Sequence, residues 1–260
     1  MNLERMRVFF FDLDGVLTVG KENPRYIGGR EVVAKIKHEG KKAMVLTNDS
    51  THTCEEIHEN LTRLGFQFNL DDILTSSSLT AMYLTEQFGH ASFFLIGEEG
   101  LRRELLAAGH EPSQGNPTVI VVGFDRQLTY SKLDDALRVL KKGAKLIGSY
   151  GGAVYMSDHG PALSAGPIIK ALEYASGQKA IMVGKPSPRM FKLALMRASG
   201  KAANAVMIGD QLETDILGAE RAGVHTILVL TGVESRESVR RSRIRPELIV
   251  DSADDLIKLL

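Results

Sequence analysis

Short apolar runs recur along the chain, separated by stretches in which apolar residues have helical spacing. The clearest runs are residues 8–11, 43–46 and 205–209. Continuous runs of this kind are typical of strands buried on both faces of a parallel sheet. Between them, as at 29–39, apolar residues fall three or four positions apart, which indicates amphipathic helices.

The other predicted elements follow the same two patterns. Further strands are predicted at 72–76, 92–97, 119–123, 145–148, 226–230 and 248–250, with another apolar stretch at 181–184. Further helices are predicted at 54–64, 79–88, 98–108, 130–142, 167–176, 189–198, 215–222 and the C-terminus, and loops at 18–28 and 151–166. Strands alternating with helices predict an α/β fold with a doubly wound, Rossmann-like parallel sheet.

Acidic residues divide this pattern into two parts. They follow the early and late strand ends but largely stop in between. The middle segment is too long for a loop and has apolar residues for a core of its own. We therefore predict a catalytic core made of 1–76 and 182–260, and an inserted α/β cap domain at 77–181. Small residues near 76–78 and 177–184 predict hinges between the two.

Composition excludes several classes of protein. Lys plus Arg and Asp plus Glu both number 32, so the net charge is zero and nothing favours a nucleic-acid polymer as partner. Cys54 is the single cysteine, which excludes an internal disulfide and a cysteine-rich metal site. No apolar run approaches the length of a membrane span, and no signal region precedes the first strand. These features predict a soluble, cytoplasmic protein that binds no membrane.

Polar side chains follow three core strands where the strands end. Asp12 and Asp14 follow the first strand, Thr47 follows the second, and Asp210 follows the strand at 205–209. Open parallel sheets bind ligands at the carboxyl ends of their strands, so we expect these residues to lie together. Carboxylates held close repel each other, and a divalent cation with oxygen ligands offsets this repulsion.

Each residue type at this edge suits one part of phosphoryl transfer. Asp12 can be a nucleophile, and Asp14 can protonate the leaving oxygen and later deprotonate water. The Thr47 hydroxyl and the backbone N–H groups after it, including that of Asn48, can bind phosphate oxygens. Lys185 offers a compact positive charge for the same oxygens.

A magnesium site is predicted beside these groups. Asp210 completes it, and Asp215 can hold the ion through water or orient its ligands. Bound Mg²⁺ would neutralise the acids and the phosphate together.

Four motifs carry these residues in order: DLDGV at 12–16, LTN at 46–48, GKPSP at 184–188 and GDQLETD at 209–215. Together they resemble the haloacid dehalogenase-like superfamily of hydrolases. The large insert, with GKPSP and GDQLETDI, is similar to the NagD-like, 4-nitrophenylphosphatase-like subgroup. The resemblance implies an aspartyl phosphate on Asp12, with Asp14 as acid and base. It also implies Mg²⁺ on Asp12, the Asp14 carbonyl and Asp210.

The chain departs from the subgroup pattern in three places. Asp49 stands where a neutral residue is usual, which adds a negative charge near the phosphate cradle. Thr18-Val19 replaces the common aromatic residue of the first loop. Residues 148–152, GSYGG, stand where the subgroup carries an Asn-Pro-Asp turn. The last two changes leave the substrate open, and the first leaves the turnover rate open.

Candidate substrate contacts lie in the insert. Asp125 follows a strand end, and Tyr150 lies in the divergent turn. For Asp125, the alternative of a turn aspartate before a helix is equally compatible with the sequence. His52, near the second motif, is interpreted as a surface or capping residue. His159 is a weaker candidate for a substrate contact.

The predicted function is a magnesium-dependent phosphatase of small phosphomonoesters. Nucleotide, sugar, glycolate and pyridoxal phosphates all fit the residues. One alternative is a phosphotransferase or mutase, which uses the same intermediate but must exclude water. Another is a sensor of phosphorylated metabolites without catalysis, which Asp14 disfavours because a sensor needs no acid. A homodimer is compatible with the sequence.

Overall fold

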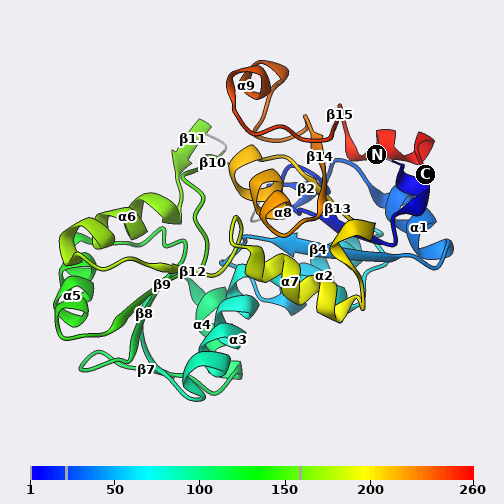
Figure 1. Ribbon diagram of the computed structural model, residues 1–260. Coiled ribbons are helices and arrows are strands. Elements are labelled where there is room, and N and C mark those ends of the chain that lie inside the picture. Colours follow the sequence, from blue (N-terminus) through cyan, green and yellow to red (C-terminus); the bar gives the residue numbers. More distant parts are fainter. Residues whose placement is uncertain (1, 21–22, 158–159) are drawn as a thin grey trace. The chain divides into compact units, whose positions relative to one another are not determined.

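The structure is a computed structural model that describes residues 2–20, 23–157 and 160–260. The chain forms two compact units, each with its own parallel sheet (Figure 1). Their segments are Met1–Thr47, Cys54–Leu74 and Pro186–Leu260 in unit 1, and Asn48–Thr53 and Thr75–Lys185 in unit 2.

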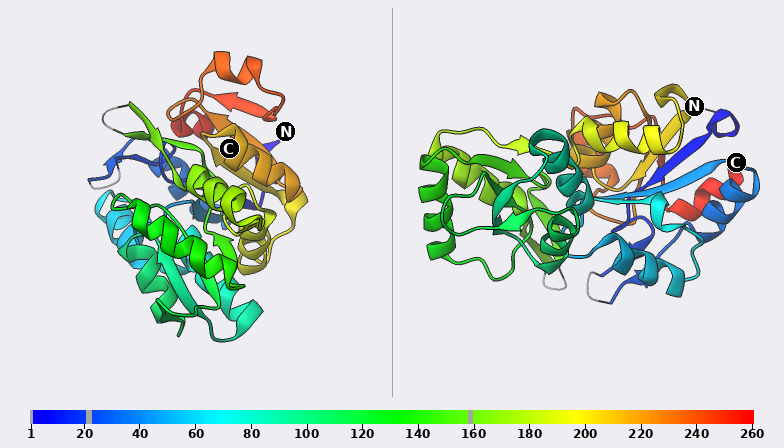
Figure 2. Two further views of the ribbon diagram at one scale, coloured as in Figure 1. Left: turned by 90° about the vertical axis from the view of Figure 1, so that its left-hand side faces the viewer. Right: turned by 90° about the horizontal axis from the view of Figure 1, so that it is seen from below.

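The division into a catalytic core and a substrate-selecting insert stays a prediction. Residues 48–53 and 182–185 lie in unit 2, whereas the sequence places both in the core, and residues 75 and 76 at the predicted boundary also lie in unit 2. The reason for the second segment is strand pairing, because β12 (Ile181–Met182) pairs with β9 (Lys145–Gly148) of unit 2. Both chain termini lie in unit 1 (Figure 2).

The sheet of unit 1 has the strand order β15-β14-β13-β1-β4-β5. Its strands are β1 (Val8–Phe11), β4 (Lys42–Thr47), β5 (Ile73–Thr75), β13 (Ala205–Gly209), β14 (His225–Val229) and β15 (Leu248–Val250). β1 is central, because it pairs in parallel with both β4 and β13.

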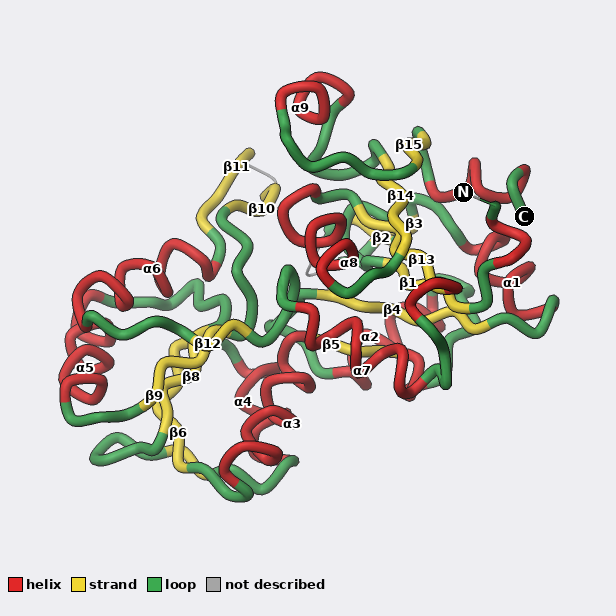
Figure 3. The backbone as a smooth tube through the Cα atoms, viewed as in Figure 1, coloured by secondary structure: helices red, strands yellow, loops and turns green. Residues whose placement is uncertain are grey.

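Helices cover both faces of this sheet (Figure 3). Side chains alternate along a strand, so Phe9 and Phe11 lie on one face of β1 and Phe10 on the other. Phe9 and Phe11 share a buried apolar cluster with residues of α1 (Arg30–His38) and α2 (Cys54–Arg63). Phe10 contacts Phe191 of α7 (Pro188–Arg197), with ring centroids 6.3 Å apart. Unit 1 is therefore a doubly wound α/β sheet, as predicted.

Shorter elements complete unit 1. The remaining helices are α8 (Leu217–Arg221) and α9 (Arg236–Arg241), and a π-helical turn, η4, spans Leu212–Ile216. The 3₁₀ turns are η1 (Leu3–Arg5), η2 (Leu70–Asp72), η3 (Ala202–Asn204) and η5 (Ala253–Lys258). The predicted C-terminal α-helix is thus a 3₁₀ helix. The strands β2 (Thr18–Val19) and β3 (Arg25–Tyr26) pair within a predicted loop.

Unit 2 has a second parallel sheet, in the order β12-β9-β8-β6-β7. Its other strands are β6 (Ser92–Ile96), β7 (Glu111–Pro112) and β8 (Val119–Val122). Its helices are α3 (Ser76–Phe88), α4 (Glu99–Ala107), α5 (Tyr130–Lys141) and α6 (Ala165–Ser176). Apolar side chains of β6, β8 and β9 pack against α5 and α6 in one buried cluster. Throughout the described part of the chain, no helix combines the length and apolar character needed to cross a membrane.

The prediction for unit 2 misses β7 and a hairpin of two strands. The predicted loop at 151–166 contains an antiparallel hairpin of β10 (Val154–Ser157) and β11 (Gly160–Leu163). Among the described residues, these two strands form a sheet of their own, separate from both parallel sheets. A hairpin outside a sheet needs no continuous apolar run, so its sequence resembles that of a loop.

Asp72 is a buried acid that ties elements of unit 1 together. Its carboxylate lies 2.9 Å from Lys37 Nζ and 2.5 Å from Lys42 Nζ, and it accepts a hydrogen bond from the Asn69 N–H at 3.0 Å. Burial raises the pKa of Asp72, but the hydrogen bonds from Lys42, Lys37 and Asn69 outweigh it and hold the pKa below its ordinary value. The charged form is thus the stable one in the folded chain.

We expect Asp72→Asn to lower the free energy of unfolding at neutral pH by about 2 kcal/mol, because two lysines lose their charged partner. The folded-state pKa of Asp72 is depressed, so its contribution is present above the unfolded-state pKa. It disappears as the pH falls through the folded-state pKa. Urea unfolding across this range tests the prediction, and a loss of the same size at neutral and strongly acidic pH would contradict it.

Candidate active site

The carboxyl ends of three neighbouring strands of unit 1 bring the predicted core residues to one sheet edge. Asp12 directly follows β1, and its N–H donates to the Ile208 carbonyl of β13 at 2.9 Å. Asp210 directly follows β13, and Thr47 is the last residue of β4. Because β4 and β13 both pair in parallel with β1, these three residues end adjacent strands at the same edge.

Three carboxylates from this edge form a tight, buried cluster. Ligand oxygens of Asp12, Asp210 and Asp215 all lie within 4.8 Å of one another. The three residues are only 5%, 1% and 0% exposed. Buried like charges at such distances repel strongly, and a hard cation with oxygen ligands relieves the repulsion. The donor set therefore fits Mg²⁺.

Backbone contacts orient Asp215 within the cluster. Its Oδ2 accepts hydrogen bonds from the N–H groups of Asp210 (3.2 Å) and Gln211 (3.1 Å). The π-helical turn η4 carries Asp215 back to the end of β13. A Cβ at Gly209 would lie 2.3 Å from the Asp215 Cβ, so only glycine leaves room for this approach. The role of Asp215 in orienting metal ligands stays a prediction.

Asp14 lies in the turn after β1 and is half-buried. Its carboxylate is not part of the three-acid cluster. The family resemblance assigns its backbone carbonyl, not its side chain, to the metal, and this leaves the carboxylate for acid and base chemistry. Gly15 follows with a left-handed φ of 84°, which turns the chain away from the strand.

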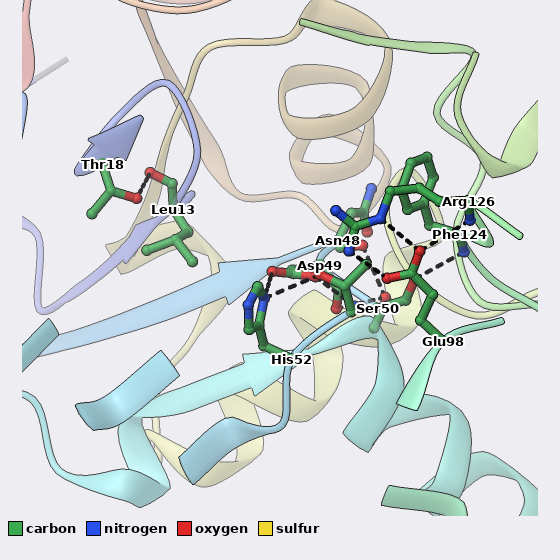
Figure 4. Close-up of polar contacts among 11 residues, drawn as sticks. Leu13, Thr18, Asn48, Asp49, Ser50, His52, Glu98, Phe124 and Arg126 are labelled. Atoms are coloured by element: carbon green, nitrogen blue, oxygen red, sulfur yellow. Dashed lines mark hydrogen bonds and ion pairs between the residues drawn. The ribbon is translucent and has the colours of Figure 1, made fainter. Parts of the chain in front are cut away.

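In unit 2, the side chain of Asn48 holds the backbone of Lys185 at two points (Figure 4 shows the side chain of Asn48). Asn48 Oδ1 accepts from the Lys185 N–H at 3.0 Å, and Asn48 Nδ2 donates to the Lys185 carbonyl at 3.1 Å. Gly184 permits this pairing, since a Cβ there would lie 2.8 Å from Asn48 Oδ1. Two of the three residues predicted to bind phosphate, Asn48 and Lys185, are therefore fixed to each other, a contact that the motifs do not reveal.

Asp49, the unusual residue of the second motif, is held within its own loop (Figure 4). Its Oδ1 accepts from the N–H (2.6 Å) and the hydroxyl (2.7 Å) of Thr51. Its Oδ2 lies 2.8 Å from Nδ1 of His52. The expected extra charge is thus met by three local donors, and His52 contributes to the loop instead of only capping a helix. In the same loop, the Ser50 hydroxyl accepts from the Phe124 N–H at 3.0 Å.

The two candidate substrate residues of the insert have partners inside unit 2. Asp125 lies 2.6 Å from Lys132 Nζ and accepts from the Gln127 N–H at 2.9 Å, as a turn aspartate does. It also lines a cavity of about 100 Å³ with Phe124, Leu163, Ser164 and others. Tyr150 is buried, and its hydroxyl shares a 2.8 Å hydrogen bond with Ser164. Their roles toward substrate stay predictions. His159 lies outside the described residues.

Family models match both parts of the chain. Residues 9–111 match the haloacid dehalogenase-like hydrolase family, and residues 182–256 match a HAD-hydrolase-like family. Chronophin from Mus musculus is 34% identical over 95% of this chain and 91% of its own length. The 5'-nucleotidase YutF from Bacillus subtilis is 28% identical over 96% of each chain.

Solved structures with the same fold cover nearly the whole chain. The 4-nitrophenylphosphatase from Thermotoga maritima is 29% identical, with a TM-score of 0.91 over 98% of each chain. NagD from Escherichia coli K-12 is also 29% identical, with a TM-score of 0.84 over 98% of each chain. These similarities extend over both units, so the insert and the core are both shared with the NagD-like subgroup.

Proposed function

The chain belongs to the haloacid dehalogenase-like hydrolases and is a phosphatase of that family, and from this premise we propose that it hydrolyses small phosphomonoesters through an aspartyl phosphate on Asp12. The observation that carries the proposal is the buried cluster of Asp12, Asp210 and Asp215 at the carboxyl edge of the sheet. Such a cluster places a nucleophile among groups suited to a divalent cation.

In the first half-reaction, a carboxylate oxygen of Asp12 attacks the phosphorus atom. A new bond forms between this oxygen and phosphorus, and the bond from phosphorus to the leaving oxygen breaks. Asp14 donates the proton that the leaving oxygen needs, so the product leaves as an alcohol. Asp14 is suited to this role because it lies two residues from Asp12, in the turn after the same strand.

In the second half-reaction, a water molecule attacks the phosphorus of the aspartyl phosphate. Asp14, now ionised, accepts a proton from this water, and inorganic phosphate and free Asp12 are formed. Asp12, the Asp14 carbonyl and Asp210 are the proposed magnesium ligands, with Asp215 orienting them. When bound, Mg²⁺ supplies positive charge that offsets the acids and the phosphoryl oxygens.

We assign phosphate binding to Thr47, Asn48 and Lys185. Thr47 contributes a hydroxyl, Asn48 a backbone N–H, and Lys185 an ammonium group. The side-chain amide of Asn48 is already hydrogen-bonded to the Lys185 backbone. We therefore assign its backbone N–H, and not its side chain, to the phosphate. Lys185 is 1% exposed, so its charge is shielded from bulk water.

We propose that the insert selects among substrates while unit 1 performs the chemistry. The catalytic acids all lie in unit 1, and Asp125 and Tyr150 lie in unit 2. The names of two relatives point to different small phosphorylated compounds: the 5'-nucleotidase YutF from Bacillus subtilis and the dihydroxyacetone phosphatase from Corynebacterium glutamicum. The substrate class is therefore a small phosphomonoester. A cytoplasmic location and a homodimer stay predictions.

A panel of phosphomonoesters with Mg²⁺ tests the proposal. We expect phosphate release from at least one of the nucleotide, sugar, glycolate or pyridoxal phosphates, with kcat/KM far above that for 4-nitrophenyl phosphate, because only a cognate leaving group engages the insert. Asp125→Asn and Tyr150→Phe are then expected to change the ranking of substrates more than the rate on the aryl phosphate. Equal losses on every substrate would assign both residues to folding.

The same panel separates the alternatives. Transfer of phosphate to an added alcohol in place of release would show a phosphotransferase. Binding of a phosphorylated compound without turnover would show a sensor.

A further inference from the structure

The loop after β14 contacts Asp210 of the acid cluster and the turn after β1, although it belongs to none of the four motifs. The Thr231 hydroxyl donates a hydrogen bond of 2.6 Å to the Gly15 carbonyl. The Val233 N–H donates a hydrogen bond of 2.8 Å to Asp210 Oδ2. Residues 231–233, here called the clamp loop, therefore touch both the turn after β1 and the acid after β13.

Between these two donors, Gly232 lies closer to Asp210 than any other residue type allows. A Cβ at position 232 would lie 2.0 Å from Asp210 Oδ2 and 2.5 Å from its Cγ. Such distances are well below van der Waals contact, so Asp210 would have to move. The backbone of Gly232 thus packs directly against one side of the Asp210 carboxylate, and the Val233 N–H donates a hydrogen bond to one of its oxygens.

We propose that the clamp loop positions Asp210, and the turn that carries Asp12 and Asp14, for magnesium binding. The inference rests on the proposed function, because it assigns the loop to the same metal site. Asp12 and Asp210 follow different strands, β1 and β13. The clamp loop follows a third strand, β14, and hydrogen-bonds both to the turn after β1 and to Asp210. Removal of a group that orients a metal ligand typically lowers metal affinity or activity by about 10- to 100-fold.

The geometry separates this role from ordinary loop packing. Ordinary packing would require only apolar contact. Here the Thr231 hydroxyl bonds to the turn after β1, the Val233 N–H bonds to Asp210, and Gly232 leaves room for the Asp210 carboxylate. The Val233 side chain is 43% exposed, so the loop is not held in place by burial of that residue. Thr231, Gly232 and Val233 are therefore positioning residues and do not themselves touch substrate.

The test measures Mg²⁺ binding to the intact chain by calorimetry, together with the rise in melting temperature that Mg²⁺ produces. Thr231→Val removes the hydroxyl at nearly constant shape, and we expect it to raise the Kd for Mg²⁺ about tenfold. Thr231→Ser keeps a hydroxyl, and we expect it to recover most of the affinity. Gly232→Ala displaces Asp210, and we expect it to weaken binding about a hundredfold.

Melting in chelator shows whether each variant is folded before metal is added. If Gly232→Ala does not fold, the comparison of Thr231→Val with Thr231→Ser still decides. A merely structural role would lower the melting temperature equally with and without Mg²⁺ and leave the Kd unchanged, and that result would overturn the proposal.

Failure of the proposed function is distinguishable from failure of this inference. If the wild-type chain binds Mg²⁺ but releases no phosphate from any substrate, the function is wrong, while weaker binding by Thr231→Val still supports the clamp loop. If the wild-type chain binds no Mg²⁺, the clamp loop has no metal to position and the inference is overturned. If the wild type is active and Thr231→Val binds Mg²⁺ equally well, only the inference fails.

Discussion

Asp12→Asn is expected to reduce phosphate release to less than about one thousandth of the wild-type rate, because an amide is a poor nucleophile at phosphorus. The amide is nearly isosteric with the carboxylate, so the fold is expected to persist. Asp12 is buried within 4.8 Å of two other acids, and the substitution removes one of three like charges. The melting temperature in chelator is therefore expected to stay equal or to rise.

Phosphate release and thermal unfolding in chelator together check this prediction. Asp71→Asn is the matched control, since it makes the same chemical change at an exposed aspartate outside the cluster. We expect wild-type turnover from that control. Near-wild-type release from Asp12→Asn would exclude the covalent mechanism. Loss of activity together with loss of the folded state would instead show that Asp12 is needed for folding.

Removal of divalent metal is expected to abolish activity, leaving less than about 1% of the rate, and addition of Mg²⁺ to restore it. The physical reason is the concentration of buried negative charge in Asp12, Asp210 and Asp215, which repels an anionic phosphate when no cation is bound. Ca²⁺ is expected to restore little activity. Its larger and looser coordination shell favours binding both oxygens of Asp12, which would then not be available for attack.

The measurement is phosphate release in excess chelator, followed by titration with Mg²⁺ or Ca²⁺. Melting temperature provides a second readout, because an ion that binds only the folded chain raises it with concentration. NaCl at matched ionic strength is the control for screening of charge. Full activity in excess chelator would contradict the proposed metal site.

Several strands of both sheets follow directly from the sequence. β1, β9, β13 and β15 have the predicted bounds, because each contains a short run of apolar residues of the kind found in parallel strands. The approach of Asp12 and Asp210 also follows from the sequence, since each directly follows one of two parallel neighbours whose carboxyl ends lie at one edge. Asp215 reaches the same cluster from the turn η4.

Other features depend on local geometry that residue types do not encode. The hairpin of β10 and β11 has glycine and proline in a stretch without apolar alternation, so the sequence indicates a loop. The hydrogen bonds of Asp49 depend on how one turn places Thr51 and His52. The clamp loop acts through a backbone N–H and the absence of a Cβ, and neither produces a recognisable pattern in one sequence.

The central position of β1 has a consequence for the chain during synthesis. One neighbour, β4, follows within a few tens of residues, but the other, β13, is made about two hundred residues later. At about 5–20 residues per second, one side of this phenylalanine-rich strand stays unpaired on the ribosome for about 10–40 s. All of unit 2 emerges in that interval and can pair its own strands first. The nascent chain thus carries an unpaired, apolar strand edge throughout this interval, and unpaired edges of this kind favour pairing with other chains.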